Sequence, residues 1–154
     1  MKNLFTALLL ALSTTAFADG FKCEQLDHNI NVKIYNNTSA EAGTRNAAVM
    51  VFSDASVAYA NKTIASFASS KRKLGQNGTS YLAVVDLRVS ESNRSGENIL
   101  GTKLGQIKEI YVDINHNYSR LIEAGDETEG TISVVKRNGK ISTFDINCVR
   151  YLKN

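Results

Sequence analysis

The sequence predicts an all-β protein, a mostly antiparallel small barrel or sandwich of about eight strands. Short runs of alternating apolar and polar residues recur along the chain, as in strands with one buried face. Turn-forming residues separate the runs at intervals of about 8 to 15 residues, and no long amphipathic helix that would serve parallel βαβ units intervenes. Cys23 and Cys148 lie near the two ends, so a disulfide between them would join the terminal strands.

The N-terminus has the order of a secretory signal peptide over residues 1–18. Lys2 supplies the positive start, Leu4–Leu12 is apolar, and Ala16–Ala18 is a small-x-small cleavage motif. The apolar run is about half of the roughly 20 residues that a spanning helix needs, so we expect no transmembrane segment. Cleavage after the motif would leave a single β domain, residues 19–154, that is secreted or periplasmic.

The charge balance excludes one large class of partner. The 154-residue chain has a formal net charge of +3, which falls to +2 when Lys2 leaves with the leader. A nucleic-acid-binding domain would carry a strong basic excess, so no nucleic-acid partner is expected. The short basic run Lys71–Lys73 is interpreted as a solvated loop.

The two cysteines are expected to form a structural disulfide, as an even number does in an exported chain. Closing so long a loop stabilises a fold by about 4 to 5 kcal/mol in the chain-entropy model. The alternative is a catalytic thiol paired with His28 or His116. Such a thiol would have to stay reduced in an oxidising compartment, and no reactive-cysteine signature surrounds Cys23 or Cys148.

The first half of the chain predicts four strands. Leu26–Tyr35 alternates strictly, which places His28 on the apolar face of the first strand. The later predicted features are strands at Ala47–Ser53 and Lys62–Ala68, a turn at Gly75–Gly78, and a strand at Tyr81–Val89 with Tyr81, Ala83 and Val85 facing inward.

The second half continues in the same manner after the polar loop Ser90–Glu97. The predicted features are a short strand at Ile99–Leu104 broken by Gly101, a strand at Ile110–Ile114, a connection at Asn115–Glu129 with one helical turn over Arg120–Ala124, and strands at Thr131–Arg137 and Lys140–Arg150. Asn138-Gly139 separates the last two strands and predicts a hairpin with a type I′ turn, in which both central residues have positive φ.

Metal and cofactor signatures are weak, and we expect neither group. Asp113–Asn117 spaces its oxygen ligands like the start of a calcium loop, but Tyr118 and Ala124 stand where glycine and glutamate are needed. Nearby acidic residues are interpreted as solvated, because a glycosidase pair needs one carboxyl in an apolar pocket. These residues are Glu123, Asp126, Glu127 and Glu129.

Catalytic signatures are equally thin, so the sequence does not favour an enzyme. There is no Gly-x-Ser-x-Gly elbow. His116, with Asp113 nearby, is the best titratable group for a site. These two residues define the alternative of a small secreted hydrolase that acts on envelope polymers.

Aromatic and polar side chains on the surface favour a binding function instead. The alternation directs Tyr35 and Tyr111 outward, and Tyr118 lies in a loop with His116 and Arg120; tyrosine suits recognition because it offers large contact area at low entropic cost. We therefore expect a monomeric, non-enzymatic exported protein that binds an envelope protein or glycan, as an inhibitor or adaptor does. A third possibility is a calycin-like carrier of a small apolar ligand, with the inward residues of Tyr81–Val85 lining its cavity.

Three further segments carry a resemblance. They are Thr44–Asp54, Gly101–Gln106 and Cys148–Lys153. Together they resemble uncharacterised small secreted proteins of predatory Bdellovibrio-type bacteria. The resemblance implies export to the periplasm or beyond, and it implies no reaction and no catalytic residues.

Overall fold

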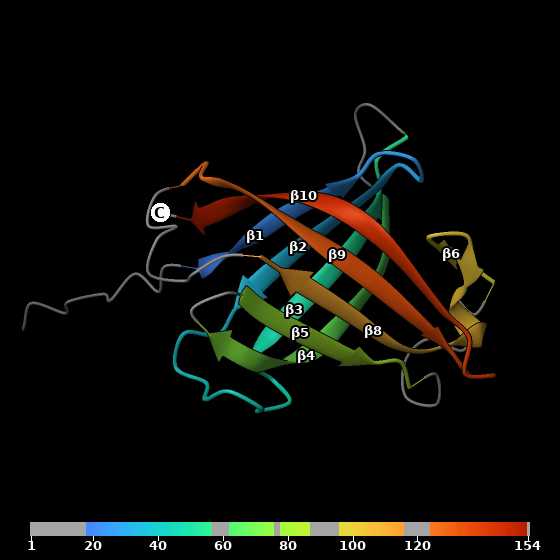
Figure 1. Ribbon diagram of the computed structural model, residues 1–154, viewed down its shortest axis with the longest axis horizontal. Coiled ribbons are helices and arrows are strands. Elements are labelled where there is room, and N and C mark those ends of the chain that lie inside the picture. Colours follow the sequence, from blue (N-terminus) through green and yellow to red (C-terminus); the bar gives the residue numbers. More distant parts are fainter. Residues whose placement is uncertain (1–17, 57–61, 76–77, 87–95, 116–123, 154) are drawn as a thin grey trace, which may run out of the picture.

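The protein is a closed eight-stranded antiparallel barrel (Figure 1). The computed structural model describes residues 18–56, 62–75, 78–86, 96–115 and 124–153. The barrel order β1-β10-β9-β8-β5-β4-β3-β2 brings the last strand back beside the first. The all-β, antiparallel prediction is therefore confirmed, and the architecture is a barrel.

The barrel strands follow one another along the chain, with one small insertion. They are β1 (Ala18–Gln25), β2 (Ile30–Asn36), β3 (Ala48–Asp54), β4 (Lys62–Gly75), β5 (Gly78–Val84), β8 (Ile107–Ile114), β9 (Glu127–Lys136) and β10 (Ile141–Lys153). The insertion is the two-stranded hairpin of β6 (Asn98–Ile99) and β7 (Thr102–Lys103), followed by the 3-10 helix η2 (Leu104–Gln106).

A disulfide crosses the seam where the barrel closes. Cys23 of β1 and Cys148 of β10 are direct partners in the antiparallel register and are joined by an S–S bond. Both side chains face inward and are buried, with 0% and 1% exposure. The predicted disulfide and the predicted contact between the terminal strands are thus confirmed.

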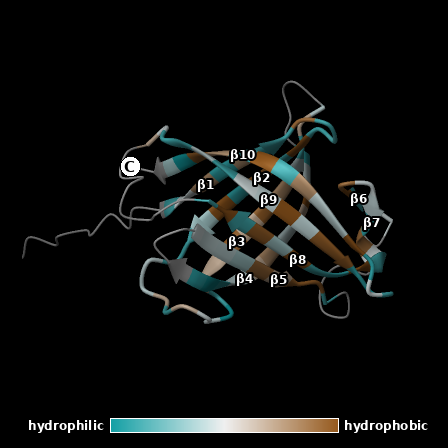
Figure 2. Ribbon diagram, in the orientation of Figure 1, coloured by the Kyte–Doolittle hydropathy of each residue, from teal (hydrophilic) through white to brown (hydrophobic). Residues whose placement is uncertain are grey.

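Hydrophobic and hydrophilic residues alternate along the barrel strands (Figure 2), and the side chains that face inward are mostly apolar. The inward orientation predicted for Tyr81, Ala83 and Val85 is confirmed, since these residues are 0 to 2% exposed. Other core residues come from all around the barrel; they include Phe21, Ile34, Met50, Phe52, Ile110, Val112, Ile132 and Ile146.

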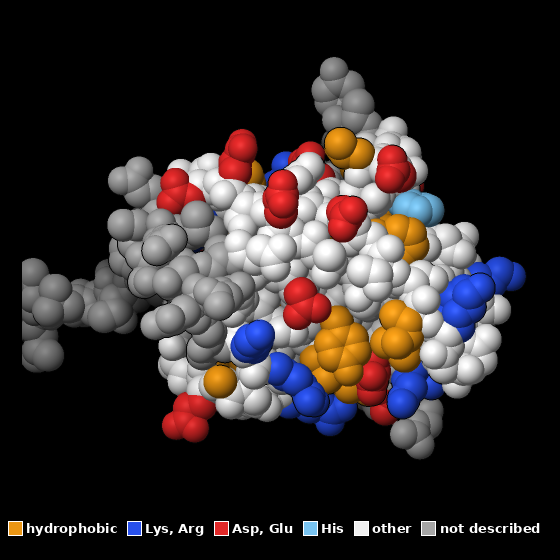
Figure 3. Space-filling model, in the orientation of Figure 1, with side chains coloured by type: hydrophobic (Ala, Val, Ile, Leu, Met, Phe, Trp, Pro, Cys, Tyr) orange, Lys and Arg blue, Asp and Glu red, His pale blue; other side chains and the backbone are white. Residues whose placement is uncertain are grey.

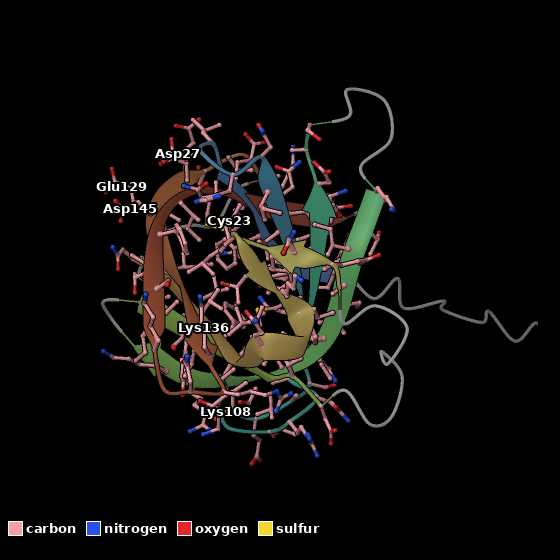
Figure 4. The ribbon with its side chains drawn as sticks, turned by 90° about the vertical axis from the view of Figure 1, so that its right-hand side faces the viewer. Cys23, Asp27, Lys108, Glu129, Lys136 and Asp145 are labelled. Carbon is pink, nitrogen blue, oxygen red and sulfur yellow. A yellow bond between two sulfur atoms is a disulfide. The ribbon has the colours of Figure 1, made fainter. Side chains whose placement is uncertain are left out.

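The inserted hairpin covers one end of the barrel (Figure 4). Ile99 and Leu104 are 0% exposed and belong to the same cluster of buried residues as the strands. The segment predicted as one interrupted strand, Ile99–Leu104, is thus a tight turn with a strand pair and the start of η2. Gly101, with φ of 72°, and Leu100, with φ of 49°, make that turn.

The prediction of a single strand over Leu26–Tyr35 is wrong. Residues 26–29 form a turn between β1 and β2, where Leu26 is 70% exposed and Asn29 has a φ of 50°. His28 is exposed in this turn and not on the inner face of a strand. The period-two pattern continues through the turn by coincidence, so the prediction extends β2 back into the turn, and it misses β1 (Ala18–Gln25).

The hairpin between β9 and β10 is confirmed, but its turn type is not. The Gly139 amide donates to the Lys136 carbonyl at 2.9 Å, and the Lys136 amide donates to the Lys140 carbonyl at 2.8 Å. Gly139 has a φ of 86°, whereas Asn138 does not have the positive φ that a type I′ turn requires. The connection therefore has three residues and one left-handed position, the second most common hairpin geometry.

The basic run also differs from its prediction. Residues 71–73 belong to β4 and not to a loop. Lys71 is 5% exposed, whereas Arg72 and Lys73 are exposed. Lys71 faces inward because it continues the alternation of the buried Phe67 and Ser69, and the register with β5 shifts only after it, between Lys71 and Lys73.

Candidate functional site

One row of apolar side chains crosses the outer surface of β3, β2, β1 and β10. Val49 pairs with Tyr35, Tyr35 pairs with Gly20, and Gly20 pairs with Tyr151. Val49 is 41% exposed and Tyr151 is 37% exposed, while Tyr35 is half-buried. We call Val49, Tyr35 and Tyr151 the tyrosine row.

Gly20 is the reason why the two tyrosine rings can meet. A Cβ atom at this position would collide with the backbone carbonyl of Ile34, so only glycine fits. The rings of Tyr35 and Tyr151 close over the bare backbone edge-to-face, with centroids 6.1 Å apart. This is a favourable arrangement for an aromatic pair.

The Tyr35 phenol is held in its protonated, hydrogen-bonding form. Partial burial raises the pKa of Tyr35, and the neighbouring Tyr151 raises it further. Charged groups lie in the adjacent outward rows: Lys22 is paired with Lys33 in the register and forms an ion pair with Glu24 at 3.1 Å. The row therefore combines apolar area, hydroxyl groups and a charged border, which suits binding.

Next to the tyrosine row, the outer surface of β1, β9 and β10 is an acidic groove. It has a volume of about 660 Å³, and its acidic lining residues are Glu24, Glu127 and Glu129. A second hollow of about 350 Å³ shares Glu24 and adds Asp27 and Asp145. Figure 3 shows acidic side chains over the upper part of this view and basic ones along its lower and right edges, and in Figure 4 Glu129 and Asp145 both point away from the barrel.

Tyr111 lies on the opposite side of the barrel from Tyr35. The two tyrosines stand on β8 and β2, four places apart in a ring of eight strands, so they cannot contribute to one binding face. The Tyr111 hydroxyl donates to Glu109 Oε2 at 3.1 Å. Burial raises the pKa of Tyr111, and the hydrogen bond to Glu109 raises it further.

Three of the predicted binding residues, His116, Tyr118 and Arg120, lie outside the described residues, as does Glu123. Asp113, the predicted companion of His116, is half-buried near the end of β8. Glu127 and Glu129 are exposed at the start of β9, as their interpretation as solvated residues expects.

A different hollow, of about 250 Å³, contains His28, Asp54 and Ser56. The Ser56 hydroxyl and amide both donate to Asp54 Oδ1, at 2.6 and 2.8 Å. These bonds, the hydroxyl first, lower the pKa of Asp54. The His28 ring packs edge-on against Phe144 with centroids 4.9 Å apart. The Asp54 carboxylate thus accepts hydrogen bonds from Ser56 in its own turn. In a Ser-His-Asp triad the carboxylate would instead orient the histidine ring.

Sequence reasoning missed a polar group inside the other end of the barrel. Arg150 Nη2 lies 3.1 Å from Asp19 Oδ1, and the Tyr81 hydroxyl donates to Asn36 Oδ1 at 2.9 Å. Lys71 Nζ donates to the carbonyl of Asn37 at 3.1 Å. We call Asp19, Asn36, Lys71, Tyr81 and Arg150 the polar end.

Burial and charge oppose each other in the polar end. Burial lowers the pKa of Lys71, and the carboxylate of Asp19 counteracts this shift. A sequence signal for the group did exist. Asp19 lies two residues before the inward Phe21 and four before Cys23, and Arg150 lies two residues after Cys148, so each charge is on the inward face of its strand. The strand periodicity therefore placed both charges inside the barrel.

The described residues contain no cluster of three or more His, Cys, Asp or Glu side chains that could hold a metal ion. In the same part of the chain, no helix has the length and apolar character needed to cross a membrane. Comparison with known proteins finds no family model, no characterised protein and no solved structure that matches this chain.

Proposed function

We propose that this protein is an exported, non-enzymatic barrel that binds an envelope protein or glycan through the tyrosine row. The observation that carries the proposal is the exposure of Val49 and Tyr151 on either side of Tyr35, in one row across four adjacent strands. A rigid sheet presents these side chains at little entropic cost, which is the usual advantage of tyrosine in binding surfaces.

Export is supported by the leader-like residues 1–18 and by the disulfide. Disulfides persist in oxidising compartments and are rare in the cytosol. The bond between Cys23 and Cys148 joins the two strands that close the barrel. A protein stabilised in this way suits a periplasmic or extracellular location.

The border of the tyrosine row supports a polar macromolecular partner. Lys22 and Lys33 lie in the outward row beside the tyrosine row, and the acidic groove begins at Glu24, the ion-pair partner of Lys22. Interfaces commonly combine an aromatic centre with a charged, solvated rim. Aromatic rings also stack on the apolar faces of sugars, so a glycan remains compatible with the same surface.

A binding experiment with paired tyrosine variants tests the proposal. Mature protein, residues 19–154, is immobilised, and saturable binding of envelope proteins and of purified envelope polymers is measured. We expect Tyr35→Ser combined with Tyr151→Ser to weaken binding by about tenfold or more, because large aromatic anchors carry most interface energy. Tyr111→Ser is the matched control, since this outward tyrosine is on the opposite side of the barrel.

Two results would contradict the proposal. Equal losses in the row variant and in Tyr111→Ser would mean that the row is not the binding surface. Release of soluble fragments from a polymer would show the hydrolase instead. Tyr35→Phe, which keeps the ring contact with Tyr151, separates the loss of a hydroxyl from the loss of folding, and melting temperatures of all variants are compared.

A further inference from the structure

The predicted cleavage site lies within a strand of the closed barrel. Ala18 is the first residue of β1 and pairs with Lys153 of β10. Asp19 pairs with Leu152 on one side and with Asn36 of β2 on the other. The peptide bond between Ala18 and Asp19 therefore lies at the start of the barrel wall, where Ala18 pairs with β10 and Asp19 pairs with both neighbouring strands.

A peptidase needs the opposite arrangement. An extended peptide is usually recognised by adding its backbone to the edge of a partner, so its own edge must be free. A closed barrel leaves no such edge. In addition, the Asp19 residue next to the bond is 8% exposed. In the folded protein the bond is consequently protected.

The residue that cleavage leaves at the new N-terminus has a structural task. Its carboxylate is 3.1 Å from Arg150 Nη2, and the two side chains are only 12% and 10% exposed. Asp19 also interacts electrostatically with buried Lys71. Within the polar end two cationic side chains thus face one carboxylate, and removing one partner from a buried ion pair is strongly destabilising.

We propose that the bond between Ala18 and Asp19 is hydrolysed before β1 joins the barrel, and that Asp19 then locks the strand against Arg150 and Lys71. Hydrolysis adds water across the amide bond, so that Ala18 gains a carboxylate and Asp19 gains an ammonium group. This inference rests on the export part of the proposed function. It does not depend on the tyrosine row.

The position of the cut follows from the same geometry. Cleavage one residue later would remove Asp19 from the mature chain and leave Arg150 without that carboxylate. A precursor that folds too early would lose its leader only slowly, because the barrel then hides the bond. The fold thus favours an early cut that keeps Asp19 in the mature chain.

A processing assay tests the order of events. Oxidised, folded precursor (residues 1–154) and reduced, urea-unfolded precursor are each diluted into detergent micelles with a purified signal peptidase. The appearance of an Asp19 N-terminus is followed by mass spectrometry. We expect the folded form to be cut at least about tenfold more slowly, because proteolysis of a folded chain follows its open population. A peptide of residues 10–25, added to the folded sample, confirms that the enzyme is active.

The outcomes separate this inference from the proposed function. Equal rates for the two precursors would overturn the protected bond but leave export and binding intact. If neither the unfolded precursor nor the peptide is cut at Asp19, export through this leader fails, and the inference fails with it. Cleavage of the unfolded form alone supports both.

The lock is tested in the mature chain, where processing plays no part. We expect Asp19→Asn to raise the unfolded-to-folded ratio in urea titrations by about a hundredfold or more, as for other broken buried pairs. Asp27→Asn is the matched control, because Asp27 is exposed in the turn between β1 and β2. Equal effects of the two substitutions would contradict a locking role for Asp19.

Discussion

Among the described residues, Tyr81 is the largest fully buried side chain, and its chemistry affects stability at high pH. Burial raises the pKa of Tyr81 above its ordinary value of 10.0, although the hydrogen bond to Asn36 opposes the shift. Between pH 10 and the raised value the folded chain keeps a proton that the unfolded chain has lost. The stability from this group is therefore complete below pH 10 and is lost as the pH rises further.

We accordingly predict that Tyr81→Phe flattens the alkaline pH dependence of unfolding. A single proton difference gives a slope of about 1.4 kcal/mol per pH unit, which this substitution removes. At pH 7 the variant should be about 1 kcal/mol less stable, since it lacks the hydrogen bond to Asn36. Urea titrations between pH 9 and 11.5 measure both effects. If Tyr81→Phe keeps the alkaline slope of the wild-type protein, the slope does not come from Tyr81. Tyr35→Phe is the control, because Tyr35 is a less buried tyrosine.

At the scale of elements, the inserted segment of β6, β7 and η2 acts as a plug for one end of the barrel. Leu104 is 0% exposed inside it, whereas Leu26, in a turn, is 70% exposed. Leu104→Ala should lower the free energy of unfolding by about 2 to 5 kcal/mol, as for other buried leucines. The same exchange at Leu26 should change it by less than about 0.5 kcal/mol. Chemical denaturation of the two variants makes the comparison, and similar losses would mean that the plug does not seal the core.

The elements that could be predicted are those whose ends are marked by turn-forming residues. Asn138-Gly139 stops one alternating run and starts another, so the last hairpin was correctly predicted. Between β1 and β2 the apolar Leu26 and the polar Asp27 continue the alternation, so the turn has no periodic signal. The turn type at Gly139 also depends on the local backbone, and an Asn-Gly pair is compatible with more than one solution.

The candidate site shows a similar division. Alternation correctly directed Tyr35 and Tyr111 outward, because the side-chain direction in a strand depends only on parity. It could not show that they lie on opposite sides, since this depends on how many strands close the ring. The partnership of Tyr35 with Tyr151 depends on strand register, which requires both neighbours of Gly20 to be known.

For the molecule as a whole, the disulfide is the strongest single constraint. Cys23 and Cys148 are 125 residues apart in sequence, and a loop of this size implies a stabilisation of about 5 kcal/mol. Reduction should therefore lower the melting temperature by more than about 10 °C. Calorimetry with and without reductant measures the change. A double Cys→Ser variant should match the reduced protein, and a melting temperature that is insensitive to reductant would contradict this role of the bond.

The strand order has one more consequence. Apart from the pairing of β1 with β10, every barrel pairing joins barrel strands that follow one another along the chain, with only the β6–β7 hairpin inserted between β5 and β8. One covalent link between the two ends would therefore make the connectivity circular. A short linker from Lys153 to Asp19 would supply that link, and new ends could be opened between β2 and β3. In such a circular permutant the seam becomes an ordinary hairpin. The entropic cost of closing the barrel then moves to a different pair of strands, and folding should begin from a different part of the chain.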